Sequence, residues 1–144
     1  MVSKRLGVRT ALAAMAAAAA LYPLAAAEPI MGRWVTGEKD AVVAIAKCGK
    51  ALCGRIEKFL VLPKGGIDQR DINNSDPAQR KRKLLGTAIL TGLTADGDAW
   101  RGQVYDPKSG KTYTSQVRRK PDGTLEVKGC VGPFCQTQVW KKAG

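Results

Sequence analysis

The side chains best suited to bind a charged ligand lie in one long polar stretch, residues 63–83. Asp71, Asn74, Arg80 and Arg82 occur there in close succession. An arginine guanidinium can hold a carboxylate or phosphate through two parallel hydrogen bonds, so Arg80 or Arg82 could capture an anion. The same set also suits a structural role, in which Asp71 and Asn74 form Asx turns and the arginines pair with acids to fasten the loop. The sequence favours the structural role and leaves the binding role open.

Aromatic side chains supply a second set of candidate contacts. Trp34 is most simply a buried core residue, with ligand stacking as the alternative. Tyr105 and Tyr113 flank a turn at 106–110. Their hydroxyls could point into an internal cavity or could hydrogen-bond a neighbouring loop. The candidate ligand-binding residues are therefore Trp34, Asp71, Asn74, Arg80, Arg82, Tyr105 and Tyr113.

Nothing in the chain forms a recognisable catalytic frame. The sequence contains no histidine, which removes Ser-His-Asp and Cys-His catalysis and histidine-ligated metal sites. Its serines therefore lack an activating base, and its carboxylates do not form a recognisable acid and base pair. Gly65-Gly66 lacks the strand, lysine and helix of a phosphate-binding loop. We expect no enzymatic activity, no cofactor and no metal.

The four cysteines occur as two pairs with the same spacing, Cys48 with Cys53 and Cys130 with Cys135. In an exported chain they indicate two disulfides, for which sequence alone permits three connectivities. We favour the local pairs, because each would join facing ends of a hairpin within disulfide reach. A zinc site built from all four cysteines and a redox-active pair are the weaker alternatives.

The N-terminal segment is typical of a secretory signal peptide. Basic residues precede an uncharged, alanine-rich run from 11 to 24, and small residues end it at Ala27. The apolar run is short for a membrane span, so a retained anchor is the less favoured alternative. Removal of residues 1–27 leaves a domain at 28–144, periplasmic or secreted, with no transmembrane segment.

The remaining chain is strongly basic. The whole sequence has a net charge of +12, of which the leader holds three, so residues 28–144 carry +9. Such a surface attracts anionic partners, although charge alone does not select one. A basic run at Arg80–Lys83 could bind phosphate or could remain a solvated cluster.

Short apolar or alternating segments separated by turn residues predict an all-β domain. Eight strands are expected, with one long polar loop at 63–83 that has one helical turn after Asp76. About eight short antiparallel strands favour a barrel or sandwich. The expected strands are 33–36, 41–47, 52–62, 85–93, 99–105, 111–119, 124–130 and 136–142.

A set of motifs spread over residues 31–141 resembles the family known as domain of unknown function 2147, small exported bacterial proteins. The motifs, in chain order, are Gly32-x-Trp34, Cys48-Gly49, Leu52-Cys53-Gly54-Arg55-Ile56, Asp71-x-x-Asn74, Asp76-Pro77, Arg80-x-Arg82, Leu85-Gly86, Trp100-x-Gly102-x-Val104-Tyr105-Asp106-Pro107-x-x-Gly110-x-x-Tyr113, Gly129 and Trp140. Gly-x-Trp also resembles the opening of lipocalins and other calycins. The resemblance implies a small antiparallel calycin-like or lipocalin-like barrel and no established activity.

Two functions follow from these expectations. The first is a non-catalytic, exported, lipocalin-like protein that binds a small apolar or amphipathic ligand in its barrel. The second is a basic surface module that binds an anionic envelope component, nucleic acid or an acidic protein, although no specific nucleic acid is expected. A structural envelope protein without a ligand has no positive sequence feature to support it.

Overall fold

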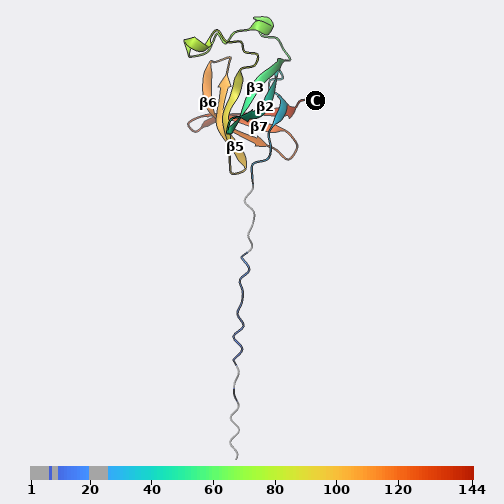
Figure 1. Ribbon diagram of the computed structural model, residues 1–144, viewed down its shortest axis with the longest axis vertical. Helices are drawn as coiled ribbons and strands as arrows, with labels where there is room; N and C mark the ends of the chain where they lie inside the picture. Colours follow the sequence, from blue (N-terminus) through green and yellow to red (C-terminus); the bar gives the residue numbers. More distant parts are fainter. Residues whose placement is uncertain (1–6, 8–9, 20–25) are drawn as a thin grey trace, which may run out of the picture.

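Eight antiparallel strands close into a barrel in which each strand pairs with the next and β8 pairs with β1. The computed structural model describes Gly7, residues 10–19 and residues 26–144 (Figure 1). The predicted all-β barrel of eight strands is confirmed. The strands are β1 (Gly32–Val35), β2 (Ala41–Cys48), β3 (Ala51–Phe59), β4 (Ala88–Asp96), β5 (Ala99–Asp106), β6 (Lys111–Arg119), β7 (Leu125–Val131) and β8 (Phe134–Lys142).

Three of the expected strand boundaries are wrong by three residues, and β8 begins two residues earlier than expected, at Phe134. β4 ends at Asp96 rather than at residue 93, and the other two boundaries lie next to the long loop. β3 ends at Phe59 rather than at residue 62, because the N–H groups of Leu60 and Val61 both donate to the carbonyl of Asp40 and so leave the ladder. β4 begins at Ala88 rather than at residue 85, because Gly86 has a φ of +85° in a turn that precedes the strand. The apolar residues at these positions belong to the loop.

The core fills the end of the barrel at which the N-terminal segment enters, called here the closed end. Trp34 is fully buried and its indole N–H donates to the carbonyl of Ile30 at 2.9 Å. The guanidinium of Arg119 lies 5.9 Å from the Trp34 ring centroid, and Trp140 is also buried. Leu90, Leu93, Val43, Val117, Leu125 and Val127 complete this apolar core.

The long loop between β3 and β4 lies at the opposite end, called here the mouth (Figure 1). It contains two 3-10 turns, η1 (Gly66–Asp68) and η2 (Pro77–Gln79). The predicted helical turn after Asp76 is confirmed, since Asp76 Oδ1 accepts the N–H of Ala78 at 3.0 Å. The loop is therefore ordered by its own side chains.

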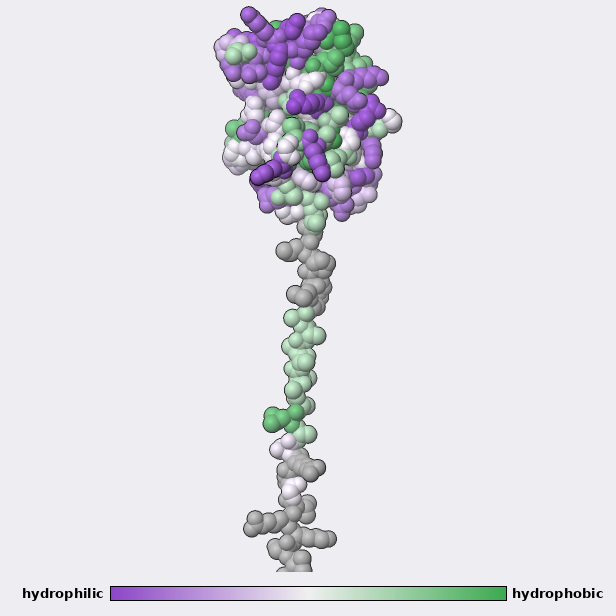
Figure 2. Space-filling model, viewed as in Figure 1, coloured by the Kyte–Doolittle hydropathy of each residue, from purple (hydrophilic) through white to green (hydrophobic). Residues whose placement is uncertain are grey.

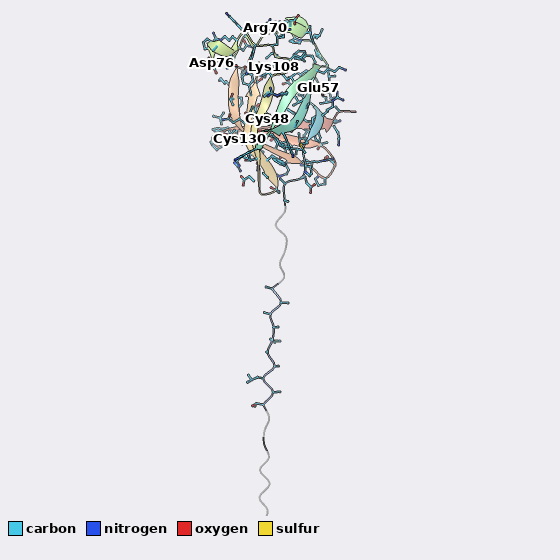
Figure 3. All side chains as sticks on the ribbon, in the orientation of Figure 1. Cys48, Glu57, Arg70, Asp76, Lys108 and Cys130 are labelled. Atoms are coloured by element: carbon cyan, nitrogen blue, oxygen red, sulfur yellow. A yellow bond between two sulfur atoms is a disulfide. The ribbon has the colours of Figure 1, made fainter. Side chains whose placement is uncertain are left out.

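Both disulfides join neighbouring strands at hairpins, which confirms the favoured local pairs. Cys130 and Cys135 face each other as expected, but Cys48 lies opposite Ala51 and Cys53 opposite Ala46, so the expected facing of Cys48 and Cys53 is wrong. Cys48–Cys53 links β2 to β3 and Cys130–Cys135 links β7 to β8, with Cα–Cα distances of 5.6 and 4.1 Å. Cys48 and Cys130 are marked in Figure 3. These pairs leave no thiolate for the four-cysteine zinc alternative.

Most of the predicted signal peptide lies outside the described residues. Its described parts, Gly7, residues 10–19 and residues 26–27, belong to no helix or strand. Within the part of the chain that the structure describes, no helix has the length and apolar character to cross a bilayer.

Candidate binding site

Four of the predicted site residues meet around the carboxylate of Asp71, which is 1% exposed. The Tyr105 hydroxyl donates to Asp71 Oδ1 at 2.5 Å. Arg82 Nε and Asn74 Nδ2 donate to Oδ2 at 2.9 and 2.8 Å. The loop's own donors thus occupy both oxygens of this carboxylate.

This Asp71 cluster lies on the outer wall of the barrel. Val104 pairs with Leu90, whose side chain is buried in the interior. Successive strand residues face opposite sides, so Tyr105 points outward to the loop. Of the two orientations considered for Tyr105 from the sequence, the structure has the one that binds a neighbouring loop.

Further contacts hold the loop in place around the cluster. Arg82 lies 5.4 Å from the Tyr105 ring centroid, and Arg80 Nε donates to the carbonyl of Asn74 at 2.8 Å. Asn74 Oδ1 accepts the N–H of Asp76 at 2.9 Å, which is the expected Asx turn. Burial, followed by the hydrogen bond to Asp71, raises the pKa of Tyr105 to about 12. These contacts hold the long loop against β5. An incoming anion would have to displace them.

Trp34 and Tyr113 lie apart from the Asp71 cluster. Trp34 is in the closed end. Tyr113 pairs with Val104 and therefore shares the inner face of the barrel near the mouth, where both side chains are half-buried. The structure consequently divides the predicted binding residues among three places.

Small residues line the inner face below Tyr113. Gly102, Ser115 and Gly129 are neighbours across β5, β6 and β7, and Gln136 continues the row in β8. The Ser115 hydroxyl is buried and has no hydrogen-bond partner within the described residues. Glycine on both sides of Ser115 leaves this hydroxyl without side-chain donors or acceptors in adjacent strands.

The inner face becomes open to solvent at β8. Gln136 pairs with Gly129 and Gln138 pairs with Val127, so both amides face the same side as the buried core. Both are nevertheless exposed, whereas Trp140, further along that face, is buried. At the hairpin between β7 and β8, Val131 and Phe134 continue the same face and are 61% and 80% exposed. We call Val104, Tyr113, Ser115, Gln136 and Gln138 the mouth surface.

Sequence reasoning missed Ser115, Gln136 and Gln138 as site residues. The signal was present, because Gln136, Gln138 and Trp140 alternate along one predicted strand and must share a face. Polar residues that alternate with a core tryptophan are unusual on an inward face, and this contrast could have identified them.

The described chain has two further hollows. One, of about 290 Å³, is lined mainly by outward-facing residues of β5, β6 and β7, Arg101, Thr114, Gln116 and Cys130, and it also touches Ser115 of the mouth surface. The other, of about 330 Å³, adjoins Glu28, Arg119 and Lys120 at the closed end. None of the residues that line either hollow belongs to the predicted ligand-binding set.

The basic run of the loop is partly neutralised. Arg82 pairs with Asp71, and Lys83 Nζ lies 2.7 Å from Asp68 Oδ1. Arg80 and Lys81 have no ion-pair partner among the described residues. Half of the run therefore remains available to solvent.

A closed eight-stranded antiparallel barrel with a buried tryptophan at one end is a lipocalin-like fold. The chain belongs to the family of uncharacterized proteins conserved in bacteria, DUF2147, whose model matches residues 32–142. A solved structure with a similar fold is protein HP1028 of Helicobacter pylori, described as belonging to the lipocalin family. The similarity has a TM-score of 0.70, with 23% identity over 81% of this chain and 84% of that chain. A search of curated proteins found no match.

Proposed function

We propose that this protein is a non-catalytic, exported binding protein that holds a small amphipathic ligand on the mouth surface. The observation that carries the proposal is the exposure of Gln136 and Gln138 on the inner face of the barrel. Inward-facing side chains that water can reach mark the part of a barrel that a ligand can enter. The closed end is filled by the chain's own core, so a ligand would lie near the mouth.

The chemistry of the mouth surface favours an amphipathic molecule. Tyr113 and Val104 offer apolar contact near the mouth, and the exposed Phe134 offers it at the hairpin between β7 and β8. Deeper on the same face, the unpartnered Ser115 hydroxyl and the Gln136 amide could donate to or accept from a polar group. Burying a polar group without a partner is costly, and a ligand oxygen or nitrogen would supply one to Ser115.

Export is part of the proposal. Two disulfides between neighbouring strands suit an oxidising compartment. In a member of a bacterial family, the compartments outside the cytoplasm are of that kind. A periplasmic or secreted location agrees with the signal-like residues 1–27.

A blocking substitution tests the binding site. Gln136→Trp would place a large side chain on the mouth surface, and Thr137→Trp would place it on the opposite face of the same exposed strand. A dansyl-labelled fatty acid is the probe, titrated by fluorescence. We expect the unmodified protein and Thr137→Trp to bind alike, and Gln136→Trp to bind about tenfold more weakly.

Two outcomes would overturn the proposal. Equal affinity of both variants would place the probe elsewhere. Native mass spectrometry of the protein purified from its own host, with no bound small molecule and no binding of the labelled fatty acid, would remove the basis for a ligand.

A further inference from the structure

Four apolar side chains face solvent beside the mouth. Leu60, Val61, Leu62 and Ile67 are 45%, 63%, 62% and 51% exposed. We call these four residues the rim patch. Figure 2 shows strong hydrophobic colour at the upper right of the barrel, over the end of β3 and the segment that leads to η1. A concentration of exposed aliphatic residues usually marks an interaction site.

The backbone fixes the rim patch in this exposed position. The N–H groups of Leu60 and Val61 donate to the Asp40 carbonyl at 2.7 and 3.1 Å, and the Gly66 N–H donates to the Pro63 carbonyl at 2.8 Å. Phe59, directly before the patch, packs against the core. The chain therefore turns outward directly after Phe59, and these backbone hydrogen bonds hold the patch on the surface.

Positive charge predominates in the segment that contains the rim patch, and the nearby acids Glu57 and Asp40 are paired with Arg33 and Lys108. Lys58 and Lys64 flank it, are exposed, and have no ion-pair partner within the described residues. Between residues 58 and 83 there are seven cationic side chains and three acidic ones, which leaves a net charge of +4. Two of the three acids are paired, Asp68 with Lys83 and Asp71 with Arg82. Figure 3 shows Arg70 at the same end of the molecule.

We propose that the rim patch docks the mouth end of the barrel onto an anionic lipid bilayer. Aliphatic side chains enter the boundary between headgroups and acyl chains, while adjacent lysines lie at the level of the lipid phosphates. The charge selects this partner over a second copy of the chain, because two copies would bring two equally positive patches together. The patch lies on the loop and not on the mouth surface, so the inference is independent of the proposed ligand site.

Vesicle flotation tests the docking surface with two matched pairs of variants. Val61→Asp and Val139→Asp each place one negative charge at an exposed valine, but only Val61 belongs to the rim patch. Lys64→Gln and Lys47→Gln each remove one exposed lysine, and only Lys64 flanks the patch. The vesicles contain phosphatidylcholine alone or phosphatidylcholine with phosphatidylglycerol, and circular dichroism confirms that each variant is folded.

We expect binding to the phosphatidylglycerol vesicles that weakens at high salt. Val61→Asp should lower the partition coefficient about tenfold and Lys64→Gln about fivefold, with the two control variants within about twofold of the unmodified protein. Equal effects within each pair, or equal binding to both vesicle types, would refute membrane docking. Sedimentation that reveals a dimer lost in Val61→Asp would instead assign the patch to a second copy.

Discussion

The carboxylate of Asp71 has no exposed side-chain surface, and it joins the long loop to β5. Asn74 and Arg82 reach it from within the long loop, and Tyr105 reaches it from β5. The sequence predicted that the loop residues would lie together, because they are close in the chain. The contribution of Tyr105 could not be predicted, since it depends on which face of β5 the loop covers.

The raised pKa of Tyr105 predicts a specific alkaline loss of stability. Burial and the hydrogen bond to Asp71 raise this pKa from 10.0 to about 12, so the folded state holds the phenolic proton more tightly than the unfolded state. The contribution of the Tyr105 proton to the free energy of unfolding is complete below pH 10 and is lost as the pH rises towards 12. At pH 8 we expect the free energy of unfolding of Tyr105→Phe to be about 1–2 kcal/mol lower than that of the unmodified protein, because the variant lacks the hydroxyl.

The measurement is urea unfolding of both proteins at stepped pH values from neutral upward. The difference in unfolding free energy should narrow above pH 10. A difference that stays constant through that range would show that the Tyr105 proton is not held by the folded state.

At the scale of elements, the docking of the long loop depends on one glycine in the turn between β5 and β6. Gly110 has a φ of +73°, and a Cβ there would lie 1.7 Å from the carbonyl oxygen of Asn73. The Asn73 side-chain Nδ2 donates to the carbonyls of Pro107 and Lys108, at 3.3 and 3.2 Å. The backbone N–H of Ser75 donates to the Gly110 carbonyl at 3.4 Å, so the backbones of loop and turn are also in contact. No side chain at position 110 is compatible with this contact.

Gly110→Ala should therefore release the loop from the turn. Gly123 is the matched control, since its φ is +84° and its Cβ would meet nothing within 4 Å. We expect Gly123→Ala to cost about 1 kcal/mol from backbone strain alone, and Gly110→Ala about 3 kcal/mol or more because of the added clash. Urea unfolding gives both values, and limited proteolysis should cut the loop faster only in Gly110→Ala. Equal costs would mean that the loop does not rest on this turn.

Strand periodicity and turn residues were sufficient to predict all eight strands, since each strand contributes at least one buried residue on one face. They misplaced the two boundaries beside the loop, the end of β4 and the start of β8. Leu60–Leu62 is apolar and continues the β3 pattern, but periodicity cannot tell an aliphatic side chain that is buried from one that faces solvent. The sequence did not predict the open inner face at β8 for a related reason. It places Gln136 and Gln138 in a strand but does not show which face of the barrel they are on.

At the scale of the whole molecule, the disulfides and the leader make a joint prediction about where the protein matures. Each disulfide closes a loop of only a few residues, so the chain-entropy estimate is about 2 kcal/mol for each. Both bonds tie strands that are already paired, Cys48 to Cys53 and Cys130 to Cys135. The barrel should therefore fold without them, at lower stability, instead of requiring them for its topology.

We accordingly expect protein recovered from the envelope of an expressing bacterium to begin at Glu28 and to contain no reactive thiol. Residues 28–144 made in a reducing cytoplasm should form the same barrel with four reactive thiols. Their free energy of unfolding should be about 4 kcal/mol lower than that of the oxidised protein. Intact mass, thiol labelling and urea unfolding distinguish the two preparations. Retention of residues 1–27 on the exported protein would refute the cleavage site, whereas equal stability of the two forms would show that the disulfides constrain strands that the β-ladder already holds.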